Sequence, residues 1–186
     1  LAEEYRIGVV GCLFWSTSYA WIKALGAREN DMGDPESTLM KAMLQYTRDV
    51  VSRYKDSPAI WGWETSNELN LAVDKPEQGE EGLKSESVFA FNRMISAEIR
   101  GLDPYRLISN GDAIYRKEQY SLKFKQSWRQ DSEEELRAVV PLFACGSIDT
   151  ISIHTYAVEP EIIRFNRPLT VMEETRIYTE IARKAG

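Results

Sequence analysis

The chain has 186 residues, 43% hydrophobic and 28% charged, with a formal net charge of −6, which predicts a soluble globular protein rather than a disordered one. The excess of acidic residues argues against nucleic acid and acidic polysaccharide as partners, because both call for a concentrated basic face. No apolar run reaches the ~18 residues of a membrane-spanning helix, so a membrane partner is not expected.

Short apolar segments rich in β-branched residues alternate along the chain with longer amphipathic segments. The predicted strands are residues 6–15, 59–63, 106–110 and 149–154. The predicted helices cover residues 35–54, 88–102, 132–143 and 170 to the end. This alternation is typical of βαβ units around a parallel sheet, so the fold class is α/β. Four consecutive βα units amount to half of an eight-unit barrel, which typically needs roughly 250 residues.

Several helix ends have recognisable signals. Asp34 is expected to cap the first helix, with Pro35 at its first position. Ser132 with the following glutamates, and Thr170 with Glu173, form capping boxes at the starts of two later helices. A long connection with Trp128 lies between the third strand and the third helix, and its length predicts a loop with a function of its own.

The two cysteines, Cys12 and Cys145, lie far apart in apolar surroundings. We expect two buried free thiols rather than a disulfide. No second pair of ligands stands near either cysteine, so no zinc site is predicted.

Asn67 and Glu68 follow the predicted strand 59–63 by a few residues. A carboxylate at the carboxyl end of a buried parallel strand points into the open mouth where ligands bind. Taken alone, the Asn-Glu pair could also be a solvated pair at the start of a loop. Glu64 would belong to the barrel wall in a structural role, and Trp61 and Trp63 would pack around the same strand.

Two longer segments carry a family resemblance. Residues 53–68 (RYKDSPAIWGWETSNE) resemble the fourth-strand signature of clan A retaining glycosidases, closest to family five, the cellulases and mannanases. Residues 149–156 (DTISIHTY) are similar to the sixth strand of that family. The resemblance implies a (β/α)8 barrel, with Glu68 as general acid/base and Asn67 contacting the sugar hydroxyl beside the scissile bond.

The same resemblance implies that His154 lines the sugar site and that Tyr156 hydrogen-bonds the nucleophile. Side chains two apart on a strand share a face, so both are expected to project toward the barrel axis. His154, the single histidine of the chain, could otherwise be a core residue with satisfied hydrogen bonds.

Three further residues are candidates for the mouth of the barrel. Residues 103–113 resemble the fifth strand of the family, which would place Asp112 at the mouth, although Asn-Gly-Asp also suits a tight turn. Trp15 and Trp128 are candidates for stacking on sugar rings, because a flat aromatic face suits the apolar face of a pyranose. Core packing is the alternative for Trp15.

Retaining hydrolysis needs a second carboxylate about 5 to 5.5 Å from the first. In the family the nucleophile ends strand seven, and residues 182–186 resemble the close of the sixth helix. The resemblance therefore implies one partial barrel domain over residues 1–186, running from strand three to helix six, truncated at both ends and inactive alone. Alternatively, residues 168–174 are the nucleophile strand, with Glu173 or Glu174 as second carboxylate, although the connection from His154 is short for a βα crossover.

The sequence thus predicts a hydrolase of β-linked polysaccharide, glucan or mannan, and the resemblance favours a secreted or periplasmic location. A non-catalytic carbohydrate-binding relative of the barrel is the alternative. A nucleotide-binding domain ranks last, because the chain lacks the glycine-rich motifs that hold phosphates. No cofactor is expected, and the open sheet edges of a half barrel predict self-association.

Overall fold

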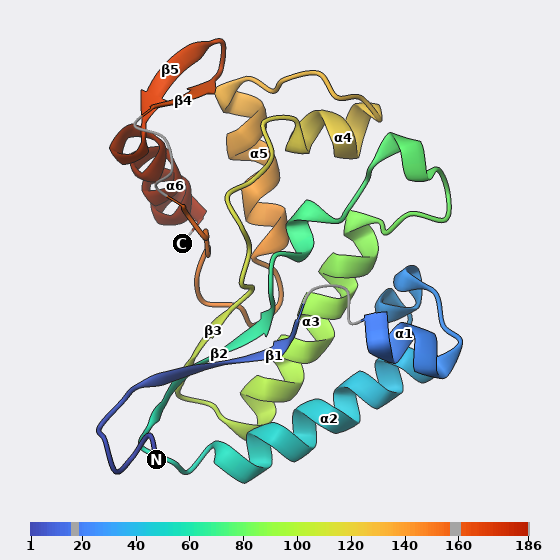
Figure 1. Ribbon diagram of the computed structural model, residues 1–186, viewed down its shortest axis with the longest axis vertical. Coiled ribbons are helices and arrows are strands. Elements are labelled where there is room, and N and C mark those ends of the chain that lie inside the picture. Colours follow the sequence, from blue (N-terminus) through green and yellow to red (C-terminus); the bar gives the residue numbers. More distant parts are fainter. Residues whose placement is uncertain (16–18, 157–160, 186) are drawn as a thin grey trace.

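A computed structural model describes residues 1–15, 19–156 and 161–185 of the chain (Figure 1). The strands are β1 Val9–Phe14, β2 Ile60–Ser66, β3 Leu107–Ser109, β4 Glu161–Arg164 and β5 Arg167–Thr170. The helices are α1 Tyr19–Leu25, α2 Thr38–Tyr54, α3 Ser85–Leu102, α4 Gln119–Lys125, α5 Glu133–Phe143 and α6 Val171–Ala185. Short 3-10 turns occupy Glu29–Gly33, Leu69–Leu71 and Pro76–Gln78.

The first three strands form a parallel sheet in the order β1-β2-β3. Cys12 lies opposite Glu64, and Trp63 lies opposite Ile108. Because α2 connects β1 to β2 and α3 connects β2 to β3, each connection is a βαβ crossover. The α/β fold class expected from the sequence is confirmed.

The predicted fourth strand, residues 149–154, continues this sheet without forming a regular strand. Two isolated parallel bridges join Ser109 to Thr150 and Ala113 to His154. Side chains replace some of the ladder bonds: the Asp149 carboxylate accepts the Ile108 amide at 2.8 Å, and the Asn110 side chain accepts the Ser152 amide at 3.3 Å. The parallel direction of residues 149–154 was predicted correctly, but these residues do not form a regular hydrogen-bonded ladder with β3.

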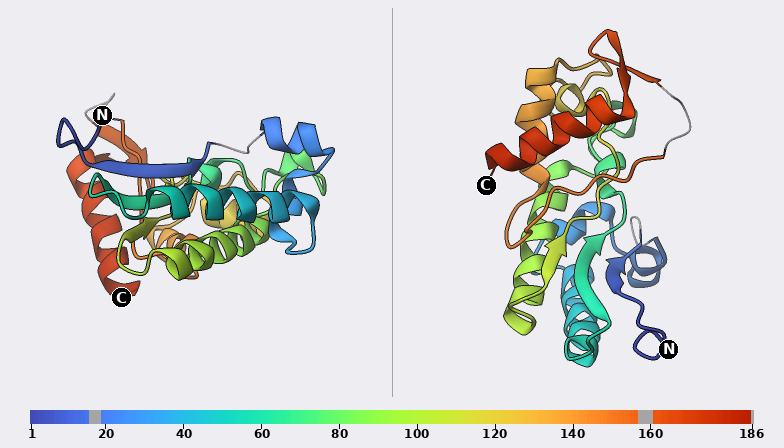
Figure 2. Two further views of the ribbon diagram at one scale, coloured as in Figure 1. Left: turned by 90° about the horizontal axis from the view of Figure 1, so that it is seen from below. Right: turned by 90° about the vertical axis from the view of Figure 1, so that its left-hand side faces the viewer.

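Helices α2 and α3 lie side by side against one face of the sheet (Figure 2). Trp63 is buried beneath them, and its indole N–H donates to Asp103 Oδ2 at 2.9 Å. Trp61 is 68% exposed, so the expectation that both tryptophans pack is wrong for this one. Trp61 has no partner in β1, because the pairing shifts between Val9, which pairs with Ile60, and Val10, which pairs with Gly62. The ring of Trp61 lies over Gly8 at the end of the sheet.

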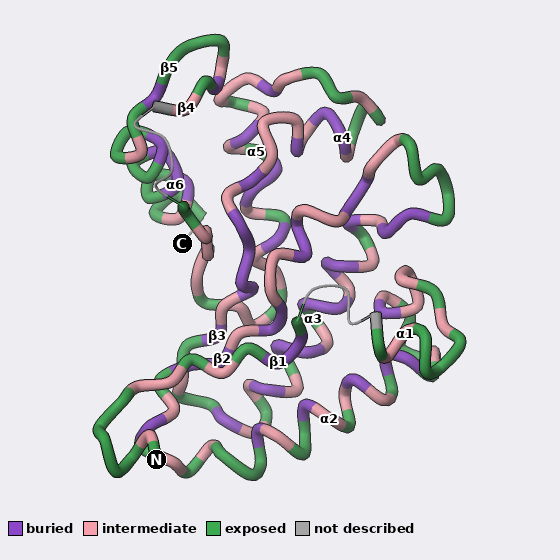
Figure 3. The backbone as a smooth tube through the Cα atoms, viewed as in Figure 1, coloured by how far each residue is buried: buried purple, intermediate pink, exposed green. Residues whose placement is uncertain are grey.

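Residues are most buried where the helices pack against the sheet. Buried positions recur along α3 and α5, whereas most of the N-terminal segment is exposed (Figure 3). The core is dominated by aliphatic and aromatic side chains from the sheet and its helices, among them Phe14, Met43, Phe91 and Ile95. Because the apolar core lies on the face of the sheet, the carboxyl ends of the strands remain available for polar side chains.

Two of the three predicted helix starts are confirmed. Ser132 Oγ accepts the Glu135 amide while Glu135 accepts the Ser132 amide, which completes a capping box on α5. Thr170 and Glu173 exchange the same pair of bonds at α6.

The start predicted at Asp34 is wrong, because α2 begins at Thr38 and Ser37 is its cap. The Ser37 hydroxyl accepts the Met40 amide at 3.0 Å, whereas the Asp34 carboxylate accepts the Glu36 amide in a local turn that holds Pro35.

The antiparallel hairpin of β4 and β5 was not predicted from the sequence. Its turn residues, Phe165 and Asn166, have φ values of 55° and 57°, as expected of a two-residue turn that matches the twist of the strands. Because β5 is paired antiparallel to β4 and runs directly into α6, residues 168–174 are not a further parallel strand of the barrel.

Both cysteines are free, as predicted, but Cys12 is exposed and Cys145 only partly buried, so the expected full burial is wrong. Cys12 lies on edge strand β1, where no further strand covers it in the described part of the chain. Within the described residues, no helix combines the length and apolar character needed to cross a membrane.

Candidate active site

The parallel strands end at a common edge, and Asn67 and Glu68 are held there by both neighbouring strands. The Asn67 amide donates to the Phe14 carbonyl at the end of β1, at 2.9 Å. The Glu68 amide donates to the Gly111 carbonyl beyond the end of β3, at 2.8 Å. The position of Glu68 therefore depends on three strand ends together and not on β2 alone.

The backbone at Glu68 adopts the left-handed conformation, with φ 57° and ψ 30°. This conformation is uncommon for a residue other than glycine and costs free energy, and it is often found at functional sites. Gly111 also has a positive φ, of 70°, and a Cβ there would lie 1.8 Å from the Ser66 carbonyl oxygen. Only glycine fits the close approach that allows the bond to Glu68.

Two side chains from residues 149–156, which follow α5 and run parallel to β3, meet the Glu68 carboxylate at one oxygen. His154 Nδ1 lies 3.1 Å from Oε1, and the Tyr156 hydroxyl donates to the same oxygen at 3.1 Å. This hydrogen bond raises the pKa of Tyr156 above its ordinary value, so the hydroxyl stays protonated as a donor. The other ring nitrogen of His154, Nε2, lies 4.0 Å from Glu64 Oε2.

The His154 backbone is fixed by the loop that follows β3. Its amide donates to the Asp112 carbonyl at 2.9 Å, and its carbonyl accepts the Ile114 amide at 3.2 Å. These bonds place the imidazole between the carboxylates of Glu64 and Glu68. Glu64 was expected to belong to the barrel wall, and only the three-dimensional position of His154 brings it into this cluster.

Asp112 faces the interior and does not open onto the mouth. Its carboxylate is 1% exposed and accepts hydrogen bonds from the Tyr115 hydroxyl at 2.5 Å and from Asn110 Nδ2 at 2.6 Å. Burial raises its pKa to about 7, the negative charge of Glu64 adds to the rise, and the Tyr115 hydrogen bond opposes it. Asp112 is therefore not at the mouth, and residues 110–112 do not form the tight turn that was the alternative.

The two candidate stacking tryptophans differ in their surroundings. Trp15 follows β1 and is 77% exposed, so it is not a core residue. Trp128 donates its indole N–H to Glu77 at 3.2 Å, and the guanidinium of Arg116 covers one ring face at 5.7 Å from the centroid. Among the described residues, neither indole is hydrogen-bonded to the catalytic candidates, and stacking on sugar stays a prediction for both.

The structure contradicts the alternative second carboxylates. Glu173 caps α6 through Thr170, and Glu174 forms a buried ion pair with Arg164 at 2.6 Å. These contacts direct the Glu173 and Glu174 side chains toward Thr170 and Arg164, and neither side chain faces Glu68. Within the described ranges no group of three or more histidine, cysteine or acidic side chains is arranged to hold a metal ion.

Comparison with known proteins gives sequence and structural relatives. No protein-family model matches the chain. It is 32% identical to mannan endo-1,4-β-mannosidase F of Aspergillus fumigatus over 93 residues, which are 50% of the chain and 19% of that protein. It is also 32% identical over 90 residues to the probable mannan endo-1,4-β-mannosidase C of Aspergillus terreus, covering 47% of the chain and 22% of that protein.

Half of the chain is similar in sequence to mannan endo-1,4-β-mannosidases. The expected resemblance to the cellulase and mannanase family is confirmed, and the chain spans about a fifth of the length of the curated relatives it matches. The fold is shared with the crystal structure of an endo-1,4-β-mannanase from Rhizomucor miehei, with a TM-score of 0.57 and 21% identity over 83% of the chain and 46% of that protein. The described strands and helices are therefore part of a (β/α) barrel.

Proposed function

We propose that residues 1–186 form one part of a barrel domain of a glycoside hydrolase that cleaves β-linked polysaccharide by retaining double displacement, with Glu68 as general acid/base. The relatives favour mannan over glucan as the substrate. The observation that carries the proposal is the convergence of His154 and Tyr156 on one oxygen of Glu68 at the strand ends. A carboxylate held in this place can protonate a leaving glycosidic oxygen and then activate water.

The two contacts assign different tasks to the two oxygens of Glu68. Oε1 faces both the imidazole and the tyrosine hydroxyl. We assign proton transfer to Oε2, because no group of the described chain hydrogen-bonds it. Fixing one oxygen orients the other toward the substrate, and correct orientation is a large part of catalytic efficiency.

Asn67 and His154 are the proposed contacts to the sugar. Asn67 precedes Glu68 and is partly buried, with its backbone held by β1. We propose that its side chain binds the hydroxyl beside the scissile bond, and that Trp15 and Trp128 add surfaces for stacking on sugar rings.

The nucleophile is proposed to lie outside the 186 residues. Within the described ranges, the carboxylate that approaches the Glu68 cluster is Glu64, and the imidazole of His154 stands between the two. A retaining pair faces the scissile bond at about 5 to 5.5 Å, with the substrate and not a side chain between the carboxylates. We therefore expect the chain by itself to bind carbohydrate without hydrolysing it.

The test uses the longer protein that this proposal requires, with β-1,4-mannan and a soluble β-glucan as substrates. Replacing Glu68 by Gln should lower the release of reducing ends by about 10²- to 10⁴-fold, the usual contribution of general acid/base catalysis. Glu80→Gln, at an exposed loop position, is the matched control and should keep full activity. Undiminished hydrolysis by Glu68→Gln would refute the role of Glu68, and hydrolysis by residues 1–186 alone would refute the placing of the nucleophile.

A second candidate is a non-catalytic carbohydrate-binding relative of the barrel. It is favoured by one observation, that Glu68 is not opposed by a second carboxylate across an open gap in the described part of the chain. Such a protein would bind mannan-derived oligosaccharides equally well with Glu68 or Gln at position 68, and its full-length form would release no reducing ends.

A further inference from the structure

Residues 110–112, directly after β3, hold the backbones of two catalytic candidates. The Gly111 carbonyl accepts the Glu68 amide at 2.8 Å, and the Asp112 carbonyl accepts the His154 amide at 2.9 Å. The two bonds come from neighbouring residues of one short segment. A displacement of this segment would therefore move Glu68 and His154 together.

A buried polar network holds the segment from the interior side. Asp112 Oδ2 accepts the Tyr115 hydroxyl at 2.5 Å and Asn110 Nδ2 at 2.6 Å. The side-chain oxygen of Asn110 accepts the Ser152 amide at 3.3 Å. Asn110, Asp112 and Tyr115 are each at most 1% exposed. In such a place the loss of one partner leaves another buried polar atom unpaired, so each member constrains the others.

Tyr115 is held in place independently of Asp112. Its amide donates to the Tyr178 hydroxyl on α6 at 3.2 Å, and its carbonyl accepts Arg164 Nη2 at 3.0 Å. Its ring meets the edge of Phe143 at 5.3 Å between centroids and stacks on Tyr178 at 6.0 Å. The phenol is therefore a fixed donor to which the Asp112 carboxyl group is bound.

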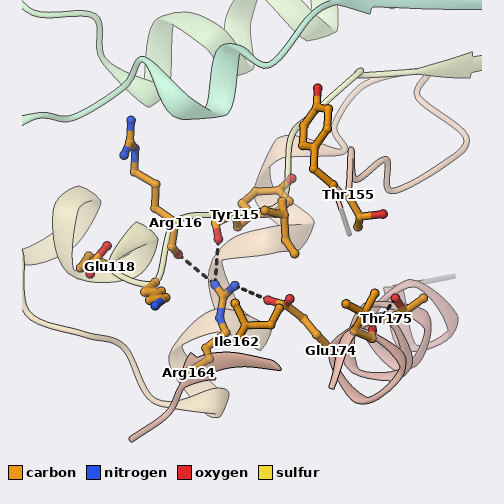
Figure 4. Close-up of a pocket in the computed structure, with 12 residues that line it drawn as sticks. Tyr115, Arg116, Glu118, Thr155, Ile162, Arg164, Glu174 and Thr175 are labelled. Carbon is orange, nitrogen blue, oxygen red and sulfur yellow. Dashed lines mark hydrogen bonds and ion pairs between the residues drawn. The ribbon is translucent and has the colours of Figure 1, made fainter. Parts of the chain in front are cut away.

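The hairpin and α6 anchor Arg164 in turn. Figure 4 shows its guanidinium between Glu174 on α6 and the carbonyls of Tyr115 and Arg116. Nη1 donates to Glu174 Oε1 at 2.6 Å, and Nη2 donates to the Arg116 carbonyl at 2.9 Å. Both charged side chains are 3% exposed, so water screens the ion pair little. Through Tyr115, the last part of the chain thus reaches the segment that holds the catalytic candidates.

The Tyr115 hydroxyl keeps its proton and acts as a donor. Burial, and after it the negative charge of Asp112, raises the pKa of Tyr115 well above its ordinary value of 10.0. At 1% exposure the side chain is too deeply buried to touch a substrate. Any effect of this hydroxyl on the reaction must therefore pass through Asp112.

We infer that Tyr115 is a positioning residue for the proposed reaction: its hydrogen bond to Asp112 fixes residues 110–112 and, with them, the backbones of Glu68 and His154. The inference rests on the proposed function for the reaction that is served, whereas the hold on the two backbones is independent of it. A catalytic group displaced by about 1 Å can slow a reaction by about 10²-fold, so a remote hydroxyl can matter.

The first test removes one buried hydroxyl and keeps the ring. Tyr115→Phe is compared with Thr47→Val, the matched control, which removes a buried hydroxyl that donates to the Met43 carbonyl at 2.9 Å on α2. Amide hydrogen exchange by NMR in residues 1–186 should be about tenfold or more faster at Glu68 and His154, relative to the amides of α3, in Tyr115→Phe. Thr47→Val should leave this ratio unchanged. A uniform rise at all amides in Tyr115→Phe, or no rise, would overturn the inference.

The second test measures kinetics in the longer protein that the proposed function requires. Tyr115→Phe should lower kcat on β-1,4-mannan by about tenfold or more and leave KM nearly unchanged, because the position of the acid/base matters most in the transition state. Asp112→Asn keeps an oxygen for the Tyr115 hydroxyl and should retain more activity than Asp112→Ala, which keeps none. A kcat equal to that of the native enzyme in Tyr115→Phe, or equal losses in the two Asp112 variants, would oppose the inference.

Two results separate failure of this inference from failure of the proposed function. Hydrolysis by the native longer protein, with unchanged exchange and unchanged kcat in Tyr115→Phe, would refute Tyr115 as a positioning residue and leave the proposed function intact. Selectively faster exchange at Glu68 and His154, in a protein whose longer form hydrolyses neither mannan nor glucan, would keep the hold of Tyr115 on these two residues and refute the hydrolase.

Discussion

The buried carboxyl group of Asp112 should make the stability of the chain depend on pH in the direction opposite to most aspartates. Burial raises its pKa from the ordinary value of 3.8 to about 7, with the charge of Glu64 adding to the rise. Between these two values the folded state holds a proton that the unfolded state releases. Stability therefore falls as the pH rises through this window, and the contribution is fully present only below about pH 4.

The size of the effect follows from the same two values. At 1.36 kcal/mol for each pH unit between them, ionised Asp112 lowers the free energy of unfolding by about 4 kcal/mol above pH 7. Asp112→Asn removes the ionisation while keeping an oxygen that can accept the Tyr115 hydroxyl. The difference in unfolding free energy between variant and native chain should thus move by about 4 kcal/mol in favour of the variant from pH 4 to pH 8.

The assay is urea unfolding followed by far-ultraviolet circular dichroism at five pH values between 4 and 8. Asp49→Asn, at an exposed position of α2, is the control, and its difference from the native chain should stay nearly constant. A difference between Asp112→Asn and native chain that stays constant, or moves in favour of the native chain as pH rises, would refute the reasoning.

Two further predictions concern local geometry. Gly111→Ala combines a positive φ with a Cβ 1.8 Å from the Ser66 carbonyl oxygen, whereas Gly26→Ala, at the end of α1 with a φ of +60° and no neighbour within 4 Å, carries only the cost of the positive φ, ~1 to 2 kcal/mol. Urea unfolding should show a clearly larger loss for Gly111→Ala, and equal losses would contradict the close approach. Ser132→Ala removes the cap of α5 and should cost about 1 kcal/mol in the same assay; a loss no greater than that of exposed Ser52→Ala on α2 would contradict the capping box.

Local signals account for what the sequence predicted well. The apolar runs before Ser66 and Ser109, and the capping boxes at α5 and α6, each depend on neighbouring residues, and they gave the parallel sheet and the helix starts. The same logic brought Glu68 and His154 together, because the carboxyl ends of parallel strands meet at one edge. Tyr156, expected to contact the nucleophile, instead donates to Glu68 in the described chain.

Non-local pairing explains what the sequence did not predict. The β4–β5 hairpin has strands of four residues, too short for a clear alternating pattern. Arg164 and Glu174 are recognisable as partners only once the hairpin folds against α6. The burial of Asp112 depends on Tyr115 and the neighbouring strand end, whereas Asn-Gly-Asp by itself has the composition of an exposed turn.

The bond between the Glu68 amide and the Gly111 carbonyl has a consequence for transplanting this chemistry into another barrel. A graft that copied only the Asn-Glu pair onto a host strand would leave the glutamate backbone without the neighbour that holds it. The transferable unit is two adjacent strand ends, with a glycine on the second strand as essential as the acid on the first. A designer who treats these two loops as a single cassette would carry the orientation of the carboxylate along with its identity.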